Sequence, residues 1–96
     1  MFVACINTAW SAPVFLFPTC NWSPAGGECT LINTSGQDVT CNIHANAQTR
    51  RGSYITAYDY RVLYQGMFAW VRVYANDPQQ DPIVYMSANA FCNTLY

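Results

Sequence analysis

The chain has 96 residues, which is enough for one domain with one core. Hydrophobic residues make up 52% of it and charged residues only 9%, so it is not disordered and has few charges to keep a monomer's surface solvated. The net charge of -1 argues against a nucleic-acid binder, which needs clustered Lys and Arg.

Residues 1–27 predict an apolar N-terminal arm. Apolar runs at 2–7 and 14–17 are followed by turn residues at 21–27, and no charged residue precedes Glu28. This segment is too hydrophobic for a solvated tail, so we expect it to cover its own domain or to add a strand to a neighbour's sheet. The residues that could supply such a strand are Phe2, Val3, Ile6, Val14, Phe15, Leu16 and Phe17.

Residues 28–96 predict a β-domain. Its first part, 28–47, reads as a hairpin whose second strand alternates between apolar residues and Thr, Asn or His. The apolar face of that strand starts at Val39 and is expected to point inward. The opposite face carries His44, which we interpret as a surface residue, because nothing in the sequence assembles a nucleophile and a carboxylate around it.

Two further strands are predicted at 54–64 and 83–92. On 54–64 we expect the tyrosines to face the core, with Asp59 and Arg61 outside as a solvated pair. The second strand ends in Cys92 and has an inner face of small residues. No window shows a sustained apolar period of 3.6, so no helix is expected.

The clearest strand is predicted at 66–76. One of its faces suits a packed interior and consists of Met67, Ala69, Val71, Val73 and Ala75. The other face is large and aromatic with one cation, and consists of Phe68, Trp70, Arg72 and Tyr74. Three covers are possible for the aromatic face: the chain's own N-terminal residues, a neighbouring subunit, or a ligand such as a sugar.

Three stretches of the domain carry a family resemblance. They are Cys29-Thr-Leu-Ile-Asn-Thr-Ser-Gly-x-x-Val-x-Cys41, then Leu63-Tyr-Gln-Gly66, then Ala69-Trp-Val-Arg-Val-Tyr-Ala75. Over residues 29–92 the chain resembles a bacterial immunoglobulin-like module of the FxLyD class. The resemblance implies an all-β fold, an immunoglobulin-like antiparallel β-sandwich, and an adhesive, structural or accessory role. It carries over no catalytic residues.

Five cysteines in so short a chain predict disulfides and an oxidising compartment. The hairpin register puts Cys29 opposite Cys41, so we expect this bond, with Cys5–Cys20 closing the arm and Cys92 left over. A Cys41–Cys92 bond across two sheets, as in immunoglobulin domains, is the alternative. A metal site is not expected, because the chain has no Cys-x-x-Cys and a single His.

These patterns predict a secreted or cell-surface protein without enzymatic activity. No catalytic residue, metal or cofactor is predicted, and no apolar run reaches the roughly 18–20 residues of a membrane span. We expect a structural or adhesive subunit that forms homo-oligomers, assembling into a filament or surface layer through its arm and aromatic strand face. The alternative is a small carbohydrate- or surface-binding module centred on Trp70, with a cell-surface glycan or protein as partner.

Overall fold

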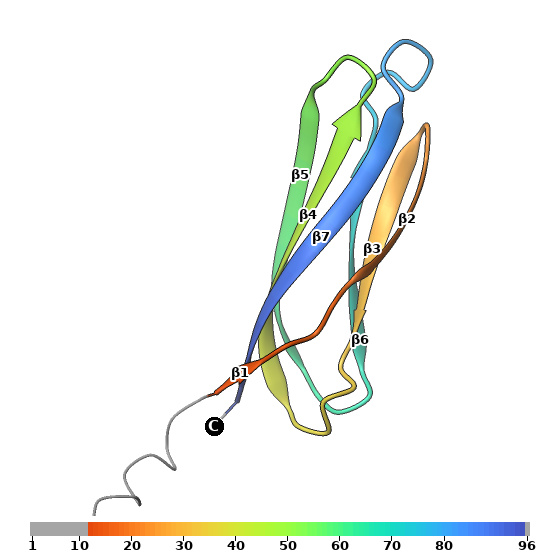
Figure 1. Ribbon diagram of the computed structural model, residues 1–96. Coiled ribbons are helices and arrows are strands. Elements are labelled where there is room, and N and C mark those ends of the chain that lie inside the picture. Colours follow the sequence, from red (N-terminus) through yellow and green to blue (C-terminus); the bar gives the residue numbers. More distant parts are fainter. Residues whose placement is uncertain (1–11, 96) are drawn as a thin grey trace, which may run out of the picture.

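The computed structural model describes residues 12–95, which form strands and no helix (Figure 1). The strands are β1 (Pro13–Val14), β2 (Thr19–Ser23), β3 (Gly26–Ile32), β4 (Val39–Thr49), β5 (Tyr54–Leu63), β6 (Phe68–Tyr74) and β7 (Ile83–Thr94). Val, Ile, Thr and Tyr recur in them, as residues that fit a pleated, half-buried surface do. The all-β prediction is confirmed.

The strands form two antiparallel sheets that lie face to face (Figure 1). The larger sheet has the order β1-β7-β4-β5 and the smaller sheet the order β2-β3-β6. Strand β4 is central and pairs with β5 on one side and β7 on the other. Strand β6 pairs only with β3, so it lies at an edge of the smaller sheet as described over residues 12–95.

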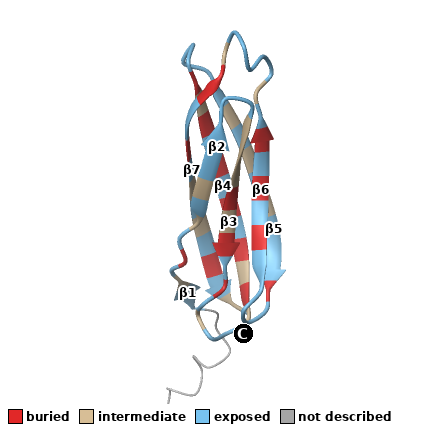
Figure 2. Ribbon diagram, turned by 90° about the vertical axis from the view of Figure 1, so that its right-hand side faces the viewer, coloured by how far each residue is buried: buried red, intermediate tan, exposed pale blue. Residues whose placement is uncertain are grey.

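The core lies between the sheets and follows the period-2 alternation of β4 and β6 (Figure 2). Every second residue of β4 from Val39 is buried, and so are Ala69, Val71 and Val73 of β6. The predicted inner faces of these two strands are therefore correct, with one exception. Met67 lies in the turn before β6 and is half exposed, because the strand begins one residue later.

The predicted orientation of β5 is wrong. Tyr54, Tyr58 and Tyr60 point to solvent, whereas Ile55 and Ala57 pack against the core. The reason is the register with β4, because directly opposed residues share a face and the tyrosines oppose the outward-facing residues of β4. Asp59 and Arg61 were expected on the outer face, but they share the phase of Ile55 and Ala57 and lie opposite buried residues of β4. They do form the expected pair, since Arg61 Nε donates to Asp59 Oδ2 at 3.0 Å, and the pair is partly exposed.

The disulfides also differ from those expected. One joins Cys20 of β2 to Cys29 of β3, and the other joins Cys41 of β4 to Cys92 of β7. Cys29 and Cys41 do not bond, because β3 and β4 belong to different sheets and do not form the predicted hairpin. Cys92 is not left over. The expected Cys5–Cys20 bond is wrong, because Cys20 bonds to the directly opposed Cys29; Cys5 itself lies outside the described residues.

The crossing from β3 to β4 is organised by one buried polar side chain, Asn33. Its Nδ2 donates to the carbonyl oxygens of Gln37 at 2.6 Å and Leu63 at 2.9 Å. Its Oδ1 accepts from the backbone N–H of Ser35 at 3.1 Å and from the Ser35 hydroxyl at 2.6 Å. Asn33 therefore ties the loop that leaves the smaller sheet to the turn that ends β5.

The described part of the predicted arm contributes to both sheets. Residues 13–14 pair with β7 as β1, and residues 19–23 pair with β3 as β2. Between them the chain crosses from one sheet to the other, and Leu16 is buried in the core. The strand-donor candidates Phe2, Val3 and Ile6 lie outside the described residues.

Candidate functional site

Strand β7 has an edge that the described residues leave without a strand partner. It pairs with β4 over its whole length, but β1 covers only Cys92 and Asn93. The Thr94 N–H donates to the Ala12 carbonyl at 2.8 Å, so the backbone N–H of Thr94 points to the β1 side of β7 and away from β4. Because N–H and C=O groups alternate sides along an antiparallel strand, those of Ala88 and Ala90 face the same side as those of Thr94.

We call residues 84–91 of β7 the open edge. At its N-terminal end the open edge is bounded by Ile83, whose N–H donates to the Pro24 carbonyl at 3.1 Å. Ala88 and Ala90 turn half-buried, small side chains toward the core. Strand β2 passes close to this side of β7, and its Trp22 packs against Tyr85 near the Ile83 end of the open edge. An unpaired edge of this length is a template for pairing with another chain.

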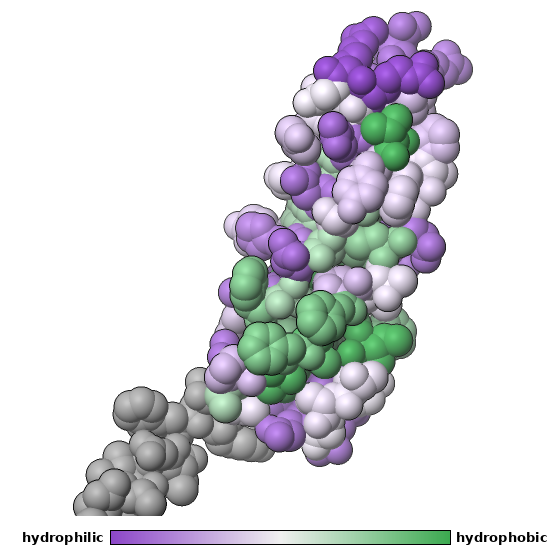
Figure 3. All heavy atoms as spheres, viewed as in Figure 1, coloured by the Kyte–Doolittle hydropathy of each residue, from purple (hydrophilic) through white to green (hydrophobic). Residues whose placement is uncertain are grey.

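An exposed apolar patch lies next to the lower end of the open edge, where β1 leads into β2 (Figure 3). Phe15 and Phe17 are 81% and 83% exposed, on either side of the buried Leu16. Ile32 of β3 and Phe68 of β6 are cross-strand neighbours on the outer face of the smaller sheet, and both are about half exposed. We call Phe15, Phe17, Ile32 and Phe68 the apolar patch.

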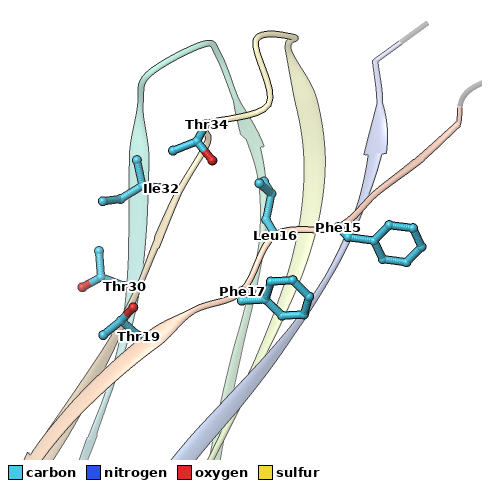
Figure 4. Close-up of a pocket in the computed structure, with 7 residues that line it drawn as sticks. All are labelled: Phe15, Leu16, Phe17, Thr19, Thr30, Ile32 and Thr34. Atoms are coloured by element: carbon cyan, nitrogen blue, oxygen red, sulfur yellow. The ribbon is translucent and has the colours of Figure 1, made fainter.

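The apolar patch borders a hollow of about 350 Å³ in the surface. Figure 4 shows its lining, with Leu16 on the inner side and the threonine side chains along one wall. The residues around it are Phe15, Leu16, Phe17, Thr19, Thr30, Ile32 and Thr34. The lining carries no charge and offers hydroxyl groups beside apolar carbon, which suits contact with another protein surface better than binding of an ion.

The aromatic face predicted on β6 is exposed. Phe68 stacks on Trp70 with ring centroids 5.5 Å apart, and the Arg72 guanidinium lies 5.4 Å from the Trp70 ring centroid. Arg72 Nε also donates to Glu28 Oε2 at 2.6 Å across the β3–β6 pair. This hydrogen bond and the charge of Glu28 raise the pKa of Arg72, so its positive charge is firmly held.

No residue between 12 and 20 covers this aromatic face, since β1 pairs with β7 and β2 lies on the far side of β3. The described part of the chain's own N-terminus is therefore not the cover for the aromatic face of Phe68, Trp70, Arg72 and Tyr74. The structure places Phe68 opposite Ile32 at one end of the smaller sheet, and leaves Tyr74 at the other end of β6.

The outer face of the larger sheet was missed as a candidate surface. His44 is exposed there and stacks on Tyr58 of β5, with ring centroids 5.3 Å apart. The signal was present in the sequence, because Tyr54, Tyr58 and Tyr60 alternate with smaller residues. Their direction could not be read without the register of β5 against β4.

Residues 12–95 lack two kinds of feature, a metal-binding cluster and a membrane-spanning helix. No group of three or more His, Cys, Asp or Glu side chains there could hold a metal ion. In the same range there is no helix of the length and hydrophobicity needed to cross a membrane.

Comparison with family models, with curated proteins and with solved structures finds no match to the chain. The resemblance to immunoglobulin-like modules therefore remains a prediction. The surface features that bear on function are the open edge, the apolar patch and the exposed aromatic faces.

Proposed function

We propose that the chain is an exported, non-enzymatic structural or adhesive subunit that assembles with copies of itself by strand addition. The observation that carries this proposal is the open edge of β7, from residue 84 to residue 91, beside an apolar patch. The occupant is the N-terminal segment of a second copy, centred on Phe2, Val3 and Ile6.

The register of β1 supports exchange between copies. Val14 lies opposite Cys92, Pro13 opposite Asn93, and Ala12 opposite Thr94, where β7 ends. The described register therefore ends where β7 ends, and among residues 12–95 no strand pairs with the open edge. Residues 1–11 of a neighbouring copy have the composition of a strand and are the segment that we propose pairs there. Such a contact joins two different surfaces and builds an open chain of subunits.

The order of the strands supports an immunoglobulin-like assignment. In immunoglobulin domains the strands A, B and E are neighbours in one sheet, and C′, C, F and G are neighbours in the other. The orders β2-β3-β6 and β5-β4-β7 match A-B-E and C′-C-F in chain order. The open edge then corresponds to the place of the last strand, G, and β1 fills two residues of it.

The two disulfides are compatible with the proposed extracellular location. The low charge of the chain fits burial of its surface in an assembly. The alternative of a sugar-binding module centred on Trp70 is less favoured, because Phe68 and Arg72 already lie against that ring.

The first test is deletion of residues 1–11. The described residues 12–95 hold both disulfides and the core, so the shortened chain should fold. Sedimentation velocity and electron microscopy are expected to show polymers for the full chain and monomers for the deletion. A full chain that stays monomeric at high concentration, or a deletion that still polymerises, would contradict the proposal.

The second test blocks the acceptor. Ala88→Pro removes an N–H that faces the open edge rather than β4, so it should stop polymer growth while the β4–β7 ladder persists. The matched control is Thr56→Pro, because by the same alternation the Thr56 N–H faces away from β4 on the free side of β5. If both variants or neither lost assembly, the open edge would not be the acceptor.

A further inference from the structure

We propose that the outer face of the larger sheet binds an uncharged polysaccharide. This gives the adhesive part of the proposed function a ligand and rests on it. It uses side chains on the outer face of the sheet, including Tyr85 and Ser87 of β7, whereas strand addition uses the backbone groups of the open edge. The face is formed by β5, β4 and β7. The polar outer side of β4 runs down its middle, with tyrosines on the β5 side and Tyr85 and Phe91 on the β7 side. We call it the tyrosine face.

The register sets out the tyrosine face in rows across three strands. In one row Gln48 of β4 lies between Tyr54 of β5 and Tyr85 of β7. Two rows further on, His44 lies beside Tyr58, whose ring stacks on the imidazole. In each of these rows an aromatic ring stands at the β5 side and a hydrogen-bonding side chain stands in the middle.

Between these two rows lies a row of short side chains, Thr56, Asn46 and Ser87. The short row leaves a hollow of about 160 Å³, lined by Asn46, Gln48, Tyr54, Tyr85 and Ser87. This is below the roughly 300–1,000 Å³ of pockets for drug-sized molecules, so it suits a single ring of a longer ligand. Trp22 of β2 packs edge-on against Tyr85 at 5.5 Å and supports one wall.

The chemistry of the hollow matches a sugar ring. A pyranose has apolar C–H faces that stack on aromatic rings, and hydroxyls around its rim that both donate and accept hydrogen bonds. Tyr54 and Tyr85 offer exposed rings, each with a hydroxyl. The amides of Asn46 and Gln48 and the Ser87 hydroxyl supply both donors and acceptors.

The charge of the tyrosine face selects among polysaccharides. None of its outward-facing residues on β4, β5 or β7 is Asp, Glu, Lys or Arg. The ion pair of Asp59 and Arg61 is on the opposite phase of β5. An anionic chain would therefore lose its hydration without gaining a cation, so a neutral polysaccharide is the ligand that fits.

The test is affinity electrophoresis of the full chain in native gels that contain soluble β-glucan, xylan or galactomannan, with polygalacturonate as the anionic comparison. We expect at least one neutral polysaccharide to slow the protein and polygalacturonate not to. The double variant Tyr54→Ala/Tyr85→Ala should weaken the binding about tenfold or more, since it removes both stacking rings. The matched control is Tyr74→Ala, which removes a tyrosine from β6 that is somewhat more exposed than Tyr54 or Tyr85, and it should bind as the parent does.

A single substitution, Asn46→Ala, repeats the test without touching an aromatic residue and should also weaken binding. The proposal is overturned if no neutral polysaccharide slows the full chain, or if Tyr74→Ala weakens binding as much as the double variant. It is also overturned if the double variant loses self-assembly in sedimentation velocity, because the tyrosine face is then a contact between copies. If the full chain is monomeric but still binds a glucan, the self-assembly proposal is contradicted and the polysaccharide proposal is not.

Discussion

Cys41 and Cys92 are directly opposed residues of β4 and β7, joined by a disulfide within one sheet with Cα atoms 4.1 Å apart. Cys20 and Cys29 make the same kind of bond within the other sheet. The alternative prediction from the sequence, a Cys41–Cys92 bond, has the correct pair of residues. The bond lies within the larger sheet, however, and does not join two sheets. Neither bond ties one sheet to the other, so the sheets are held together by core packing and by the loops that connect them.

The two disulfides should contribute unequally to stability. Cys41 and Cys92 are 51 residues apart in sequence, whereas Cys20 and Cys29 are 9 apart. Loop-closure entropy then gives about 4 kcal/mol for the first bond and about 3 kcal/mol for the second. Urea unfolding should show a larger loss for Cys41→Ala/Cys92→Ala than for Cys20→Ala/Cys29→Ala. Equal losses or the reverse order would mean that chain entropy does not govern their contribution.

Asn33 should be the most sensitive polar residue of the described fold. Asn33→Ala leaves the buried Leu63 carbonyl without its side-chain donor and should cost about 1–3 kcal/mol in urea unfolding. Asn33→Asp should cost more at pH 7, because a carboxylate would face the carbonyl oxygens of Gln37 and Leu63.

The Asn33→Asp variant also gives a pH test. Burial among carbonyl oxygens should raise the pKa of the introduced carboxyl above its ordinary value of about 3.9. A raised pKa in the folded state means that the penalty is small at low pH and grows as the pH rises. The gap to the parent in unfolding free energy should therefore shrink at acid pH. A gap independent of pH would show that this side chain is not enclosed by those acceptors.

Much of the fold could be predicted where local alternation decides it. The inner faces of β4 and β6 follow from strict alternation of apolar and polar residues, and the absence of a 3.6 period excluded helices. The same alternation predicts that Phe68, Trp70, Arg72 and Tyr74 share the face opposite the core, but it does not decide whether that face is covered.

The remaining features depend on which strands pair, and this is not local. Both phases of β5 contain residues that a core could accept, so only its register with β4 decides that Tyr58 points outward. The bond of Cys29 depends on the pairing of β2 with β3, and the predicted hairpin of β3 with β4 does not exist. The open edge likewise follows from strand order, and alternation within β7 gives no sign of it.

Gly27 should resist substitution mainly because of the Met86 side chain, with Trp22 Cβ a further close neighbour at 3.0 Å. A Cβ added there would overlap Met86 Sδ, which belongs to a buried residue. We expect Gly27→Ala to cost about 1–3 kcal/mol in urea unfolding, as overpacking does. The cost should fall when Gly27→Ala is made in a Met86→Ala background, which removes the obstacle.

The matched control for this coupling is Gly26→Ala. There the obstacle is the backbone carbonyl oxygen of Val73, 2.8 Å from the added Cβ. Shortening Met86 cannot move that oxygen, so the cost of Gly26→Ala should be the same in both backgrounds. Equal coupling of Met86 to Gly26 and Gly27 would contradict the steric explanation.

Phe15, Leu16 and Phe17 should respond to substitution in opposite ways. Leu16 is 7% exposed and belongs to the core, so Leu16→Ala should cost about 2–5 kcal/mol in urea unfolding. Phe15→Ser and Phe17→Ser change exposed side chains and should alter stability by no more than about 0.5 kcal/mol. The two Phe variants should instead reduce self-association in sedimentation velocity, because they remove the apolar patch.

Comparing Leu16→Ala with the two Phe variants shows which part of the N-terminal arm packs in its own domain and which part can be donated to a neighbouring copy. If Leu16→Ala is costly in the monomeric deletion of residues 1–11, Leu16 packs in its own domain, and the donated strand must come from residues before Ala12. If Leu16→Ala costs no more than Phe15→Ser in that background, residues 15–17 do not anchor the crossing between β1 and β2. Exchange between copies would then involve a longer segment than residues 1–11.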